Sequence, residues 1–437
     1  MSPVVAQDSL IEAYRSRRAE LAGAESGWVE ELRRQAAERF EETGLPGPRE
    51  EVWRHTPLDP IRRVPFRPAA NGAATLPVDL PERVGEAYRV AVTGSGTLLD
   101  IPENGLPRGL TIGSLVESLD RVKGRLGQLA NCESPGITAV NTALFDRGVL
   151  IELAPHLTLD RPVHVVHHVE SNGEPRAAFP RVVIVAGEGS QGVIVEHYRS
   201  GGDSPTLSAP VTEIFVESNA RLDHVRLQEE SERAFHVGRV VAEQQSASRL
   251  RSWSLALGSS LARVDIETRL AGEGAECSLE GIFAGRNRQH LDHYTRIDHA
   301  SPSTSSRETY KGILDDRARG VFLGHILVRP GAQKINANQT SRSVVLSRGA
   351  RVNMKPWLEI YADDVRCTHG TTVGHLDDDA LFYLRSRGIS LAEARATLLR
   401  GFAWEVLKEL PVDTLRSRLD HQMLMWLGNG VAGRLES

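Results

Sequence analysis

A cysteine and a histidine two residues apart, Cys367 and His369, lie in the segment ADDVRCTHGTTVG, residues 362–374. A thiolate and an imidazole can bind a metal together, and they can also act as a nucleophile and its base. On a strand, residues two apart point to the same side, so both groups could address one ion or cluster. A tetrahedral zinc site needs four ligands, so a second subunit would have to complete the shell. The spacing alone leaves open a shared metal or cluster site, a catalytic dyad and an ordinary strand.

Histidines gather in two other segments, VHVVHHVE and QHLDHYTRIDH. The candidate side chains are His164, His167 and His168 in the first segment and His290, Asp292, His293 and His299 in the second. Alternation along a strand would put His164 and His168 on one face. Both segments have strand patterns, so the four-residue spacing of His164 and His168 is not that of a helical zinc motif, and neither segment has a neighbouring thiolate. We therefore expect hydrogen-bonded strand histidines rather than metal sites.

The segment GEGSQG, residues 187–192, matches the glycine pattern of dinucleotide-binding loops. Such a loop needs its last glycine to open a helix whose N-terminus meets the pyrophosphate. Here the strand pattern VIVEHY follows, so we interpret these glycines as a turn between strands. The chain contains no Walker phosphate loop and no G-x-S-x-G, H-E-x-x-H or C-x-x-C motif. These absences argue against ATP binding by a Walker loop and against the enzyme classes that carry the other motifs.

Composition and charge exclude several classes of protein. The chain has 437 residues, 40% of them hydrophobic and 25% charged, which is typical of a folded protein with a large core. The formal charge of −5, without a run of Lys and Arg, disfavours nucleic-acid binding. No apolar run approaches the length of a membrane span, and the N-terminal segment lacks a signal-peptide core. The three cysteines, Cys132, Cys277 and Cys367, are too few for a disulfide scaffold, so we expect a cytoplasmic protein.

The elements that position these residues fall into three regions. Residues 7 to about 60 have helical patterns, with Gly44 as a stop signal. The helical pattern is then interrupted by the prolines Pro46, Pro48, Pro57 and Pro60. In this arm we expect Trp53 to anchor the chain to the core rather than to recognise a ligand.

From about residue 160 to 375 the chain consists of short segments rich in β-branched residues. Ser190, Ala220, Ser248 and Ala275 each open a similar strand, at spacings of 30, 28 and 27 residues. A repeat of this size indicates one supersecondary unit stacked on the next. A β-solenoid fits best, with a propeller as the alternative, although no WD or kelch signature supports a propeller.

The last 60 residues return to helical patterns. Asp377 is placed to cap the segment DDALFYLRSR, and Ser390 with Glu393 forms a capping box for the next helix. The final helix has a broad apolar face, formed by Leu415, Leu419, Met423, Leu424 and Trp426. This face could pack on its own domain or bind a partner.

Long blocks of the sequence resemble the SufB/SufD family of iron–sulfur cluster assembly scaffolds. These blocks are QHLDHYTRIDHASPSTSSRETYKGIL, GVFLGHILVRPGAQKINANQTSRSVVLS and PWLEIYADDVRCTHGTTVGHLDDDALFYLRSRGIS. The resemblance covers roughly residues 160 to 430 and is closest to the SufD branch. The segment EEVWRHTPL resembles the SufD N-terminal arm, and the chain has CTHG where SufB proteins typically have Cys-x-His-Glu.

The resemblance implies a mainly β fold, with a right-handed parallel β-helix flanked by helical regions. The expected domains are an N-terminal helical domain and connecting arm (residues 1–160), the β-helix (residues 161–376) and a C-terminal helical domain (residues 377–437). It also implies a heterodimer with SufB in which each subunit carries one copy of the ATPase SufC on its C-terminal helices. The residues expected to bind this partner are Phe402, Trp404, Leu415, Leu419, Met423 and Trp426.

The resemblance further implies a role for the Cys-x-His pair. His369 matches a SufD histidine that faces a SufB cysteine and helps to hold a transient iron–sulfur cluster, and Cys367 matches a cysteine of less certain role. No cofactor is expected to bind stably to this chain alone. The cysteines of the family's sulfur relay belong to SufB, so we expect Cys277 to pack in the core, and a packing role is also open for Cys367.

The function that follows is a non-enzymatic scaffold subunit that supports cluster assembly and iron acquisition. One alternative is a β-helix carbohydrate-active enzyme, which would need paired carboxylates in a groove. The candidates for such a pair are Glu273, Glu276 and Glu280. Another alternative is a homodimeric version of the scaffold.

Overall fold

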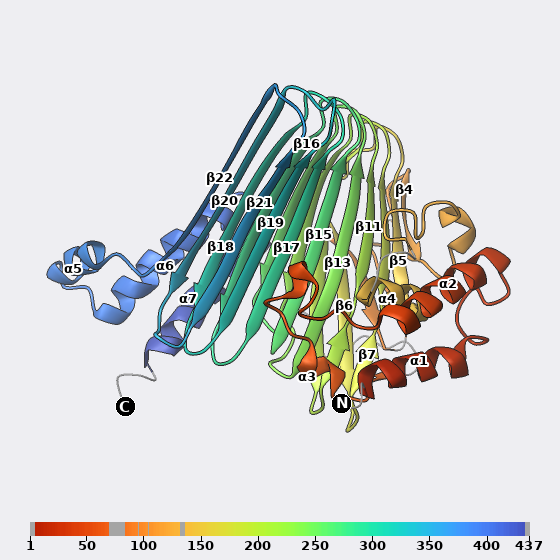
Figure 1. Ribbon diagram of the computed structural model, residues 1–437, viewed down its shortest axis with the longest axis horizontal. Helices are drawn as coiled ribbons and strands as arrows, with labels where there is room; N and C mark the ends of the chain where they lie inside the picture. Colours follow the sequence, from red (N-terminus) through yellow and green to blue (C-terminus); the bar gives the residue numbers. More distant parts are fainter. Residues whose placement is uncertain (1–4, 70–83, 95, 104, 132–135, 433–437) are drawn as a thin grey trace.

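The structure is a computed structural model that describes residues 5–69, 84–94, 96–103, 105–131 and 136–432. Two long sheets run side by side through most of the molecule, and helices lie at both ends of the stack (Figure 1). The chain alternates between the two sheets, adding one strand to each sheet per turn. The fold is therefore mainly β, with a β-solenoid core, as the sequence predicts, and the propeller alternative is wrong.

The strands of the solenoid pair in parallel except at its N-terminal end, where β2 with β3 and β4 with β5 are antiparallel. The first sheet contains β4 (Leu110–Ser114), β5 (Gly148–Leu153), β8 (Arg181–Ala186), β11 (Val211–Val216), β13 (Ala234–Gln244), β15 (Leu261–Leu270), β17 (His290–His299), β19 (Arg319–Val328) and β21 (Arg351–Ile360). The second sheet contains β3 (Gly96–Asp100), β2 (Tyr88–Thr93), β6 (Val163–Ser171), β9 (Gln191–Gly202), β12 (Arg221–Gln228), β14 (Arg249–Ala256), β16 (Glu276–Gly285), β18 (Ser305–Leu314), β20 (Ile335–Val345) and β22 (Val365–Gly374). The short strands β1 (Arg67–Pro68), β7 (Arg176–Ala178) and β10 (Thr206–Ser208) pair beside the first sheet.

The repeat seen in the sequence is the step from one turn to the next. Ser190, Ala220 and Ser248 stack in one column. Arg221, which follows Ala220, donates its backbone N–H to the Ser190 carbonyl at 2.8 Å, and Arg249, which follows Ser248, donates to the Ala220 carbonyl at 2.8 Å. These small side chains are fully buried. Valine, leucine and isoleucine fill the space between the sheets, which explains the nearly continuous apolar runs of the strands.

The glycine pattern at residues 187–192 forms one of the corners between the sheets. β8 ends at Ala186 and β9 begins at Gln191, so the predicted turn is confirmed. Gly189 has a φ of 64°, and the equivalent corners of the following turns hold Asn219 at 61° and Ala247 at 53°. The corner requires a left-handed residue, which glycine and asparagine adopt at least cost.

The N-terminal region combines helices with the first strands of the solenoid. Its helical elements are α1 (Val5–Arg17), α2 (Gly27–Thr43), η1 (Glu51–Trp53), α3 (Asp59–Arg62), η2 (Leu119–Val122) and α4 (Ile137–Leu144). Gly44 ends α2 with a φ of 62°, as predicted. Pro60 does not break a helix but lies in the first turn of α3, where a missing N–H costs nothing. Because β2 and β5 already pair with β6 and β8, the sheets extend across the expected boundary at residue 160.

Trp53 anchors the N-terminal arm to the first sheet, as expected. Its ring is buried, and the guanidinium of Arg263 lies 3.7 Å from the ring centroid. Arg263 is itself buried and pairs with Asp265 and Asp292. The arm thus covers a charged network that would otherwise face solvent.

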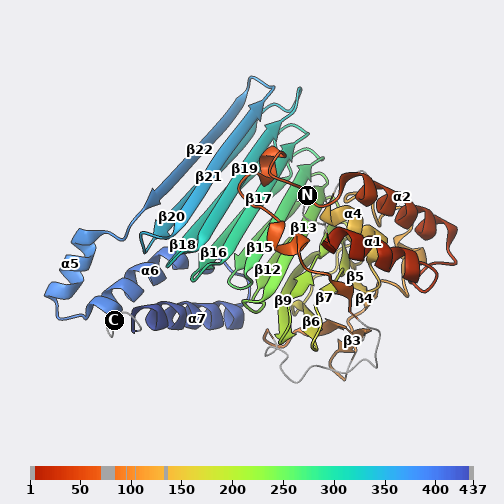
Figure 2. The same cartoon turned by 60° about the horizontal axis from the view of Figure 1, so that its bottom comes forward.

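The C-terminal region contains α5 (Asp378–Ser386), α6 (Leu391–Leu407) and α7 (Asp413–Ala432). The Asp377 cap and the Ser390–Glu393 capping box are both present. α6 and α7 pack against the outer face of the second sheet (Figure 2). Lys311 of β18 secures α6, since its buried ammonium donates to the Phe402 carbonyl at 2.9 Å and lies 4.2 Å from the Phe402 ring centroid. In the part of the chain that the structure describes, no helix is both long and apolar enough to cross a membrane.

Candidate functional site

The last turn of the solenoid leaves its inner face uncovered. β21 and β22 are the outermost strands of their sheets, at the end of the stack opposite the N-terminal helices (Figure 1). In the preceding strand β20, the inward-facing residues are almost completely buried, and they are Ile335, Ala337, Gln339, Ser341 and Ser343. Their partners in β22 are half-buried or exposed, because no described strand follows.

We call the inward-facing side chains of this last turn the open rung. They are Val352, Met354, Pro356 and Leu358 of β21, with Val365, Cys367, His369, Thr371 and Val373 of β22. The open rung is mostly apolar, and terminal turns of repeat proteins normally need a cap that hides such a surface. The outer edge of β22 is also a row of backbone groups that is unpaired among the described residues. This end of the molecule therefore combines exposed apolar side chains with an unpaired strand edge.

Cys367 and His369 face the same side of β22, as the spacing predicts, but their surroundings differ. Cys367 is half-buried against an apolar cluster that includes Ile335 and Ala337, and burial raises the pKa of its thiol. His369 is exposed and stacks one rung beyond the buried Gln339. The structure thus presents an imidazole at the centre of the open rung beside a thiol that packs with apolar side chains.

The first histidine segment is split between two environments. His164 lies on the outer face of the second sheet, and among the described residues neither of its ring nitrogens has a hydrogen-bond partner. Burial holds its pKa well below the usual value, so the ring is neutral. His167 faces the interior, where Nε2 lies 3.4 Å from Oε2 of the buried Glu196. The expectation of hydrogen-bonded histidines is therefore wrong for His164, whose ring stacks on that of His197 with 5.7 Å between the ring centroids. His167 also makes no hydrogen bond among the described residues, and its ring nitrogens have only the ion-pair contact with Glu196.

The second histidine segment is hydrogen-bonded as expected. His290 Nε2 lies 2.9 Å from Thr56 Oγ1, and His293 Nε2 lies 3.0 Å from Ser254 Oγ. His299 bonds to the hydroxyls of Thr304 and Ser306 at 2.8 and 2.9 Å, and Asp292 pairs with Arg263. Across the described residues no group of three or more His, Cys, Asp or Glu side chains could hold a metal ion.

The three glutamates considered for a glycosidase do not form a pair in a groove. Glu273 is exposed at a corner, while Glu276 is exposed and bound to Arg249 at 2.6 Å. Glu280 is buried and bound to Arg307 at 2.9 Å. Two of the three carboxylates are thus held in ion pairs with arginine, one exposed and one with a buried carboxylate. Cys277 is fully buried, and burial raises the pKa of its thiol, which agrees with a packing role. Cys132 lies outside the described residues.

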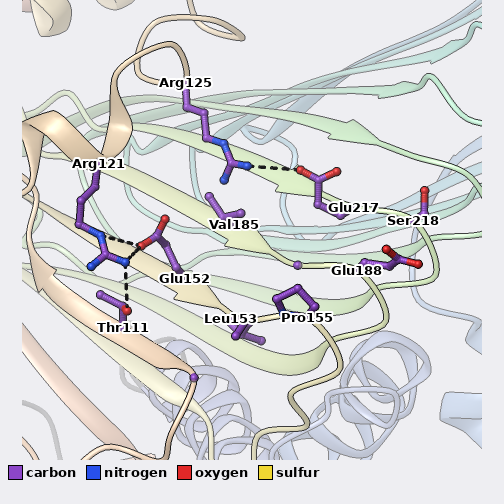
Figure 3. Close-up of a pocket in the computed structure, with 13 residues that line it drawn as sticks. Thr111, Arg121, Arg125, Glu152, Leu153, Pro155, Val185, Glu188, Glu217 and Ser218 are labelled. Atoms are coloured by element: carbon purple, nitrogen blue, oxygen red, sulfur yellow. Dashed lines mark hydrogen bonds and ion pairs between the residues drawn. The ribbon is translucent and has the colours of Figure 1, made fainter.

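A cavity of about 520 Å³ lies at the opposite, N-terminal end of the solenoid (Figure 3). Arg121 binds Glu152 at 2.5 Å, and Arg125 lies 3.5 Å from Glu217 across its floor. Because the two arginines are already paired with the carboxylates beside them, the cavity offers no free cluster of one charge to a ligand.

The residues predicted to bind a partner divide into two groups. Leu415, Leu419 and Met423 are at most 2% exposed, because they pack against the second sheet. Of the two alternatives for this face, the structure therefore shows packing within the chain for these three side chains. Phe402 and Trp426 are half-buried at the margin of the same cluster. Of the predicted set, only Trp404 is largely accessible to solvent, with 39% of its surface exposed.

The exposed aromatic side chains of the C-terminal region were missed in the sequence. Phe382 and Tyr383 of α5 are 75% and 57% exposed, and Leu391 at the start of α6 is 37% exposed. We call Phe382, Tyr383, Leu391 and Trp404 the exposed helical residues. A signal was present, because Phe382 and Tyr383 are adjacent in the segment DDALFYLRSR and α5 buries only Leu381. Adjacent helix positions point about 100° apart, so one buried stripe could not accommodate both aromatic rings.

Comparisons with known proteins agree over nearly the whole chain. Residues 168–402 match the family model for the SufBD core domain of SUF-system FeS cluster assembly, and residues 4–165 match the SufBD N-terminal region. An iron–sulfur cluster assembly SufBD family protein of Synechocystis is 29% identical, with 94% of each chain covered. The iron–sulfur cluster assembly protein SufD of Escherichia coli is also 29% identical, with 90% of each chain covered. A chloroplastic protein of Arabidopsis thaliana, ABCI7, is 27% identical over 89% of this chain and 84% of its own.

Proposed function

The chain belongs to the SufBD family of iron–sulfur cluster assembly proteins, and from this premise we propose that it is a SufD-type scaffold subunit that pairs with SufB and binds the ATPase SufC. The observation that carries the proposal is the open rung, an uncovered apolar surface with His369 at its centre. A partner solenoid docked on this end would cover both the apolar side chains and the free strand edge. The complex would act in the cytoplasm, in keeping with the few cysteines of the chain.

In this arrangement the nascent cluster is the cargo, held between the two subunits. A neutral imidazole binds iron, and His369 is directed at the surface that the partner would cover. Cys367 has a smaller role, because its thiol packs with apolar side chains and its raised pKa disfavours the thiolate that iron binds. The remaining ligands would come from the partner, since two protein groups on one strand cannot surround a cluster. The chain would thereby support cluster assembly and iron acquisition without catalysing a reaction itself.

Purification of the native protein under gentle conditions tests the partnership. We expect SufB and SufC to co-purify with the chain. Charged substitutions in the open rung, such as Val373→Glu and Leu358→Glu, should release SufB, because a buried unpaired charge costs several kcal/mol. The matched control is Leu99→Glu, since Leu99 is 47% exposed on β3 at the other end of the molecule. Retention of SufB by the open-rung variants would contradict the proposed interface.

A second copy of the chain is the other candidate partner for the open rung, because the same uncovered face exists on every copy. A homodimeric scaffold predicts that the isolated chain is dimeric in solution and that Val373→Glu makes it monomeric. The mass of the isolated protein by light scattering measures this directly. A dimer that persists only without SufB would indicate a storage form rather than the working complex.

SufC is proposed to dock on the C-terminal helices through the exposed helical residues, and point variants there test the idea. Replacing Phe382 and Tyr383 with serine should weaken SufC binding by about 2 kcal/mol, roughly thirtyfold in Kd, because aromatic side chains dominate interface energies. Deleting α7 would be a poor test, because Leu415 and Leu419 form part of the solenoid's own core. The measurement is titration calorimetry with purified SufC, with Leu99→Ser as the control. Unchanged affinity in the Phe382 and Tyr383 variant would place the docking site elsewhere.

The isolated chain is expected not to hydrolyse ATP. Its sequence carries no phosphate-cradling loop, and the one glycine-rich segment with a similar pattern is a corner of the solenoid. Phosphate release by the purified protein, free of SufC, should equal the blank at millimolar ATP. ATP hydrolysis that co-purifies with the chain through two further purification steps would contradict the assignment of a non-catalytic subunit.

A further inference from the structure

A buried column of polar residues leads from the interior of the solenoid to His369. Glu308 of β18 pairs in register with Gln339 of β20, and Gln339 pairs in register with His369 of β22. Glu308 and Gln339 are both fully buried, whereas His369 is exposed. Parallel strands lie about 4.8 Å apart, so these three side chains stack one rung above another.

Gln339 is held in one orientation by its neighbours. Its Nε2 donates a hydrogen bond to Glu308 Oε2, one rung below. Gly324, across the interior on β19, makes room for this amide, since a Cβ there would lie 2.0 Å from Nε2. Burial raises the pKa of Glu308 to about 7, so above that pH its side chain is a carboxylate that only accepts, and the amide nitrogen is the end of Gln339 that points toward it.

The carbonyl end of the same amide has no partner. Gln339 Oε1 is buried and accepts no hydrogen bond from the described residues. Because the oxygen and nitrogen of an amide diverge from one carbon, an Nε2 that points to Glu308 in the rung below leaves Oε1 directed away from Glu308. The residue of this column in the rung above is His369. A buried acceptor without a donor costs roughly 1–3 kcal/mol, so a donor at this position is favoured.

We propose that Gln339 is a positioning residue for His369, with its Oε1 accepting the N–H of one imidazole nitrogen. This role rests on the proposed function of His369 as a cluster ligand and adds to it. The hydrogen bond holds the neutral ring in a single tautomer and presents the other nitrogen, with its lone pair, to the open rung. Metal-binding histidines commonly depend on such a second hydrogen bond, whose loss costs about 10–100-fold in metal affinity or activity.

The orientation of the imidazole can be measured without a cluster or a partner. Nitrogen-15 NMR of the histidine-labelled chain at pH 8 reports the tautomer of each ring, and the His369 signals are identified by their loss in His369→Asn. We expect two well-separated ring-nitrogen shifts for His369, as in a single tautomer. In Gln339→Met, which keeps the side-chain length but removes the acceptor, the two shifts should converge toward an average.

Two further variants separate positioning from general damage. Glu308→Gln keeps an acceptor for Gln339 Nε2, so the His369 shifts should remain separated. Ser341→Ala removes the next buried polar group on the same strand and should also leave them unchanged. Averaged shifts in the wild-type chain, or wild-type shifts in Gln339→Met, would overturn the proposal.

The consequence for the cargo is tested separately in the assembled complex. Gln339→Met should lower the retention of a reconstituted cluster under chelator challenge by about tenfold or more, as expected for loss of such a hydrogen bond. The proposed ligand role of His369 fails if His369→Ala retains the cluster as well as wild type. The pairing of Gln339 with His369 is judged by the NMR result alone, so the two failures are distinguishable.

Discussion

Replacing His369 with alanine is expected to leave the chain folded and the SufB complex assembled, while the complex loses most of its iron–sulfur cluster. His369 is exposed on an edge strand, so its removal creates no cavity and costs the fold little. It is the imidazole of the open rung, and a cluster shared across an interface needs ligands from both chains. The measurement is cluster absorbance and iron content after anaerobic reconstitution of wild-type and variant complexes.

Two neighbours in the same rung serve as controls for this experiment. Thr371→Ala changes the next inward-facing residue of β22 and should leave cluster content unchanged. Cys367→Ser should have an effect smaller than that of His369→Ala, because the thiol packs against apolar side chains. Equal cluster loading in wild type and His369→Ala would remove His369 from the list of ligands.

Acid is expected to destabilise the solenoid well above the pH at which carboxylates titrate. Burial lowers the pKa of His293 to about 3 and that of His299 to about 4, so both rings stay neutral in the folded protein. In the unfolded chain they take up protons near pH 6.5, so stability is lost as the pH falls from about 6.5 toward 4. Each ring should lower the free energy of unfolding by about 2 kcal/mol between pH 7 and pH 5.

Urea unfolding of wild type and His293→Gln at the two pH values measures this effect. Glutamine can still bond to Ser254 but cannot take up a proton, so the variant should lose about 2 kcal/mol of the pH dependence. Ser254→Ala is the control, because it removes the hydrogen bond to His293 without removing the titrating group. That variant should be less stable at both pH values by a similar amount. An unchanged pH dependence in His293→Gln would show that His293 does not remain neutral in the fold.

Local patterns in the sequence were sufficient for the architecture. The step of 27 to 30 residues between Ser190, Ala220, Ser248 and Ala275 is the length of one turn, and the structure stacks these residues in a single column. Repetition is visible in a sequence because each turn buries its face against the next in the same way. The capping box of Ser390 and Glu393 was equally readable, because both partners lie within one helical turn.

Contacts between segments far apart in the sequence could not be predicted from local patterns. The apolar face of α7 could have met a partner or the protein itself, and only the packed structure shows Leu415 and Leu419 against the second sheet. His164 and His167 differ by three positions and so face opposite sides of β6, but which side is the interior depends on the strands around them.

The Cys-x-His pair shows which features follow from the local sequence and which depend on the tertiary structure. The sequence by itself determined that Cys367 and His369 point to one side, because alternation along a strand is a property of the backbone. Only the tertiary structure decided that this side belongs to the last turn and is left uncovered, with Cys367 packed and His369 exposed. The number of turns that follow a strand is a property of the whole stack, so no local pattern around residue 369 could have revealed it.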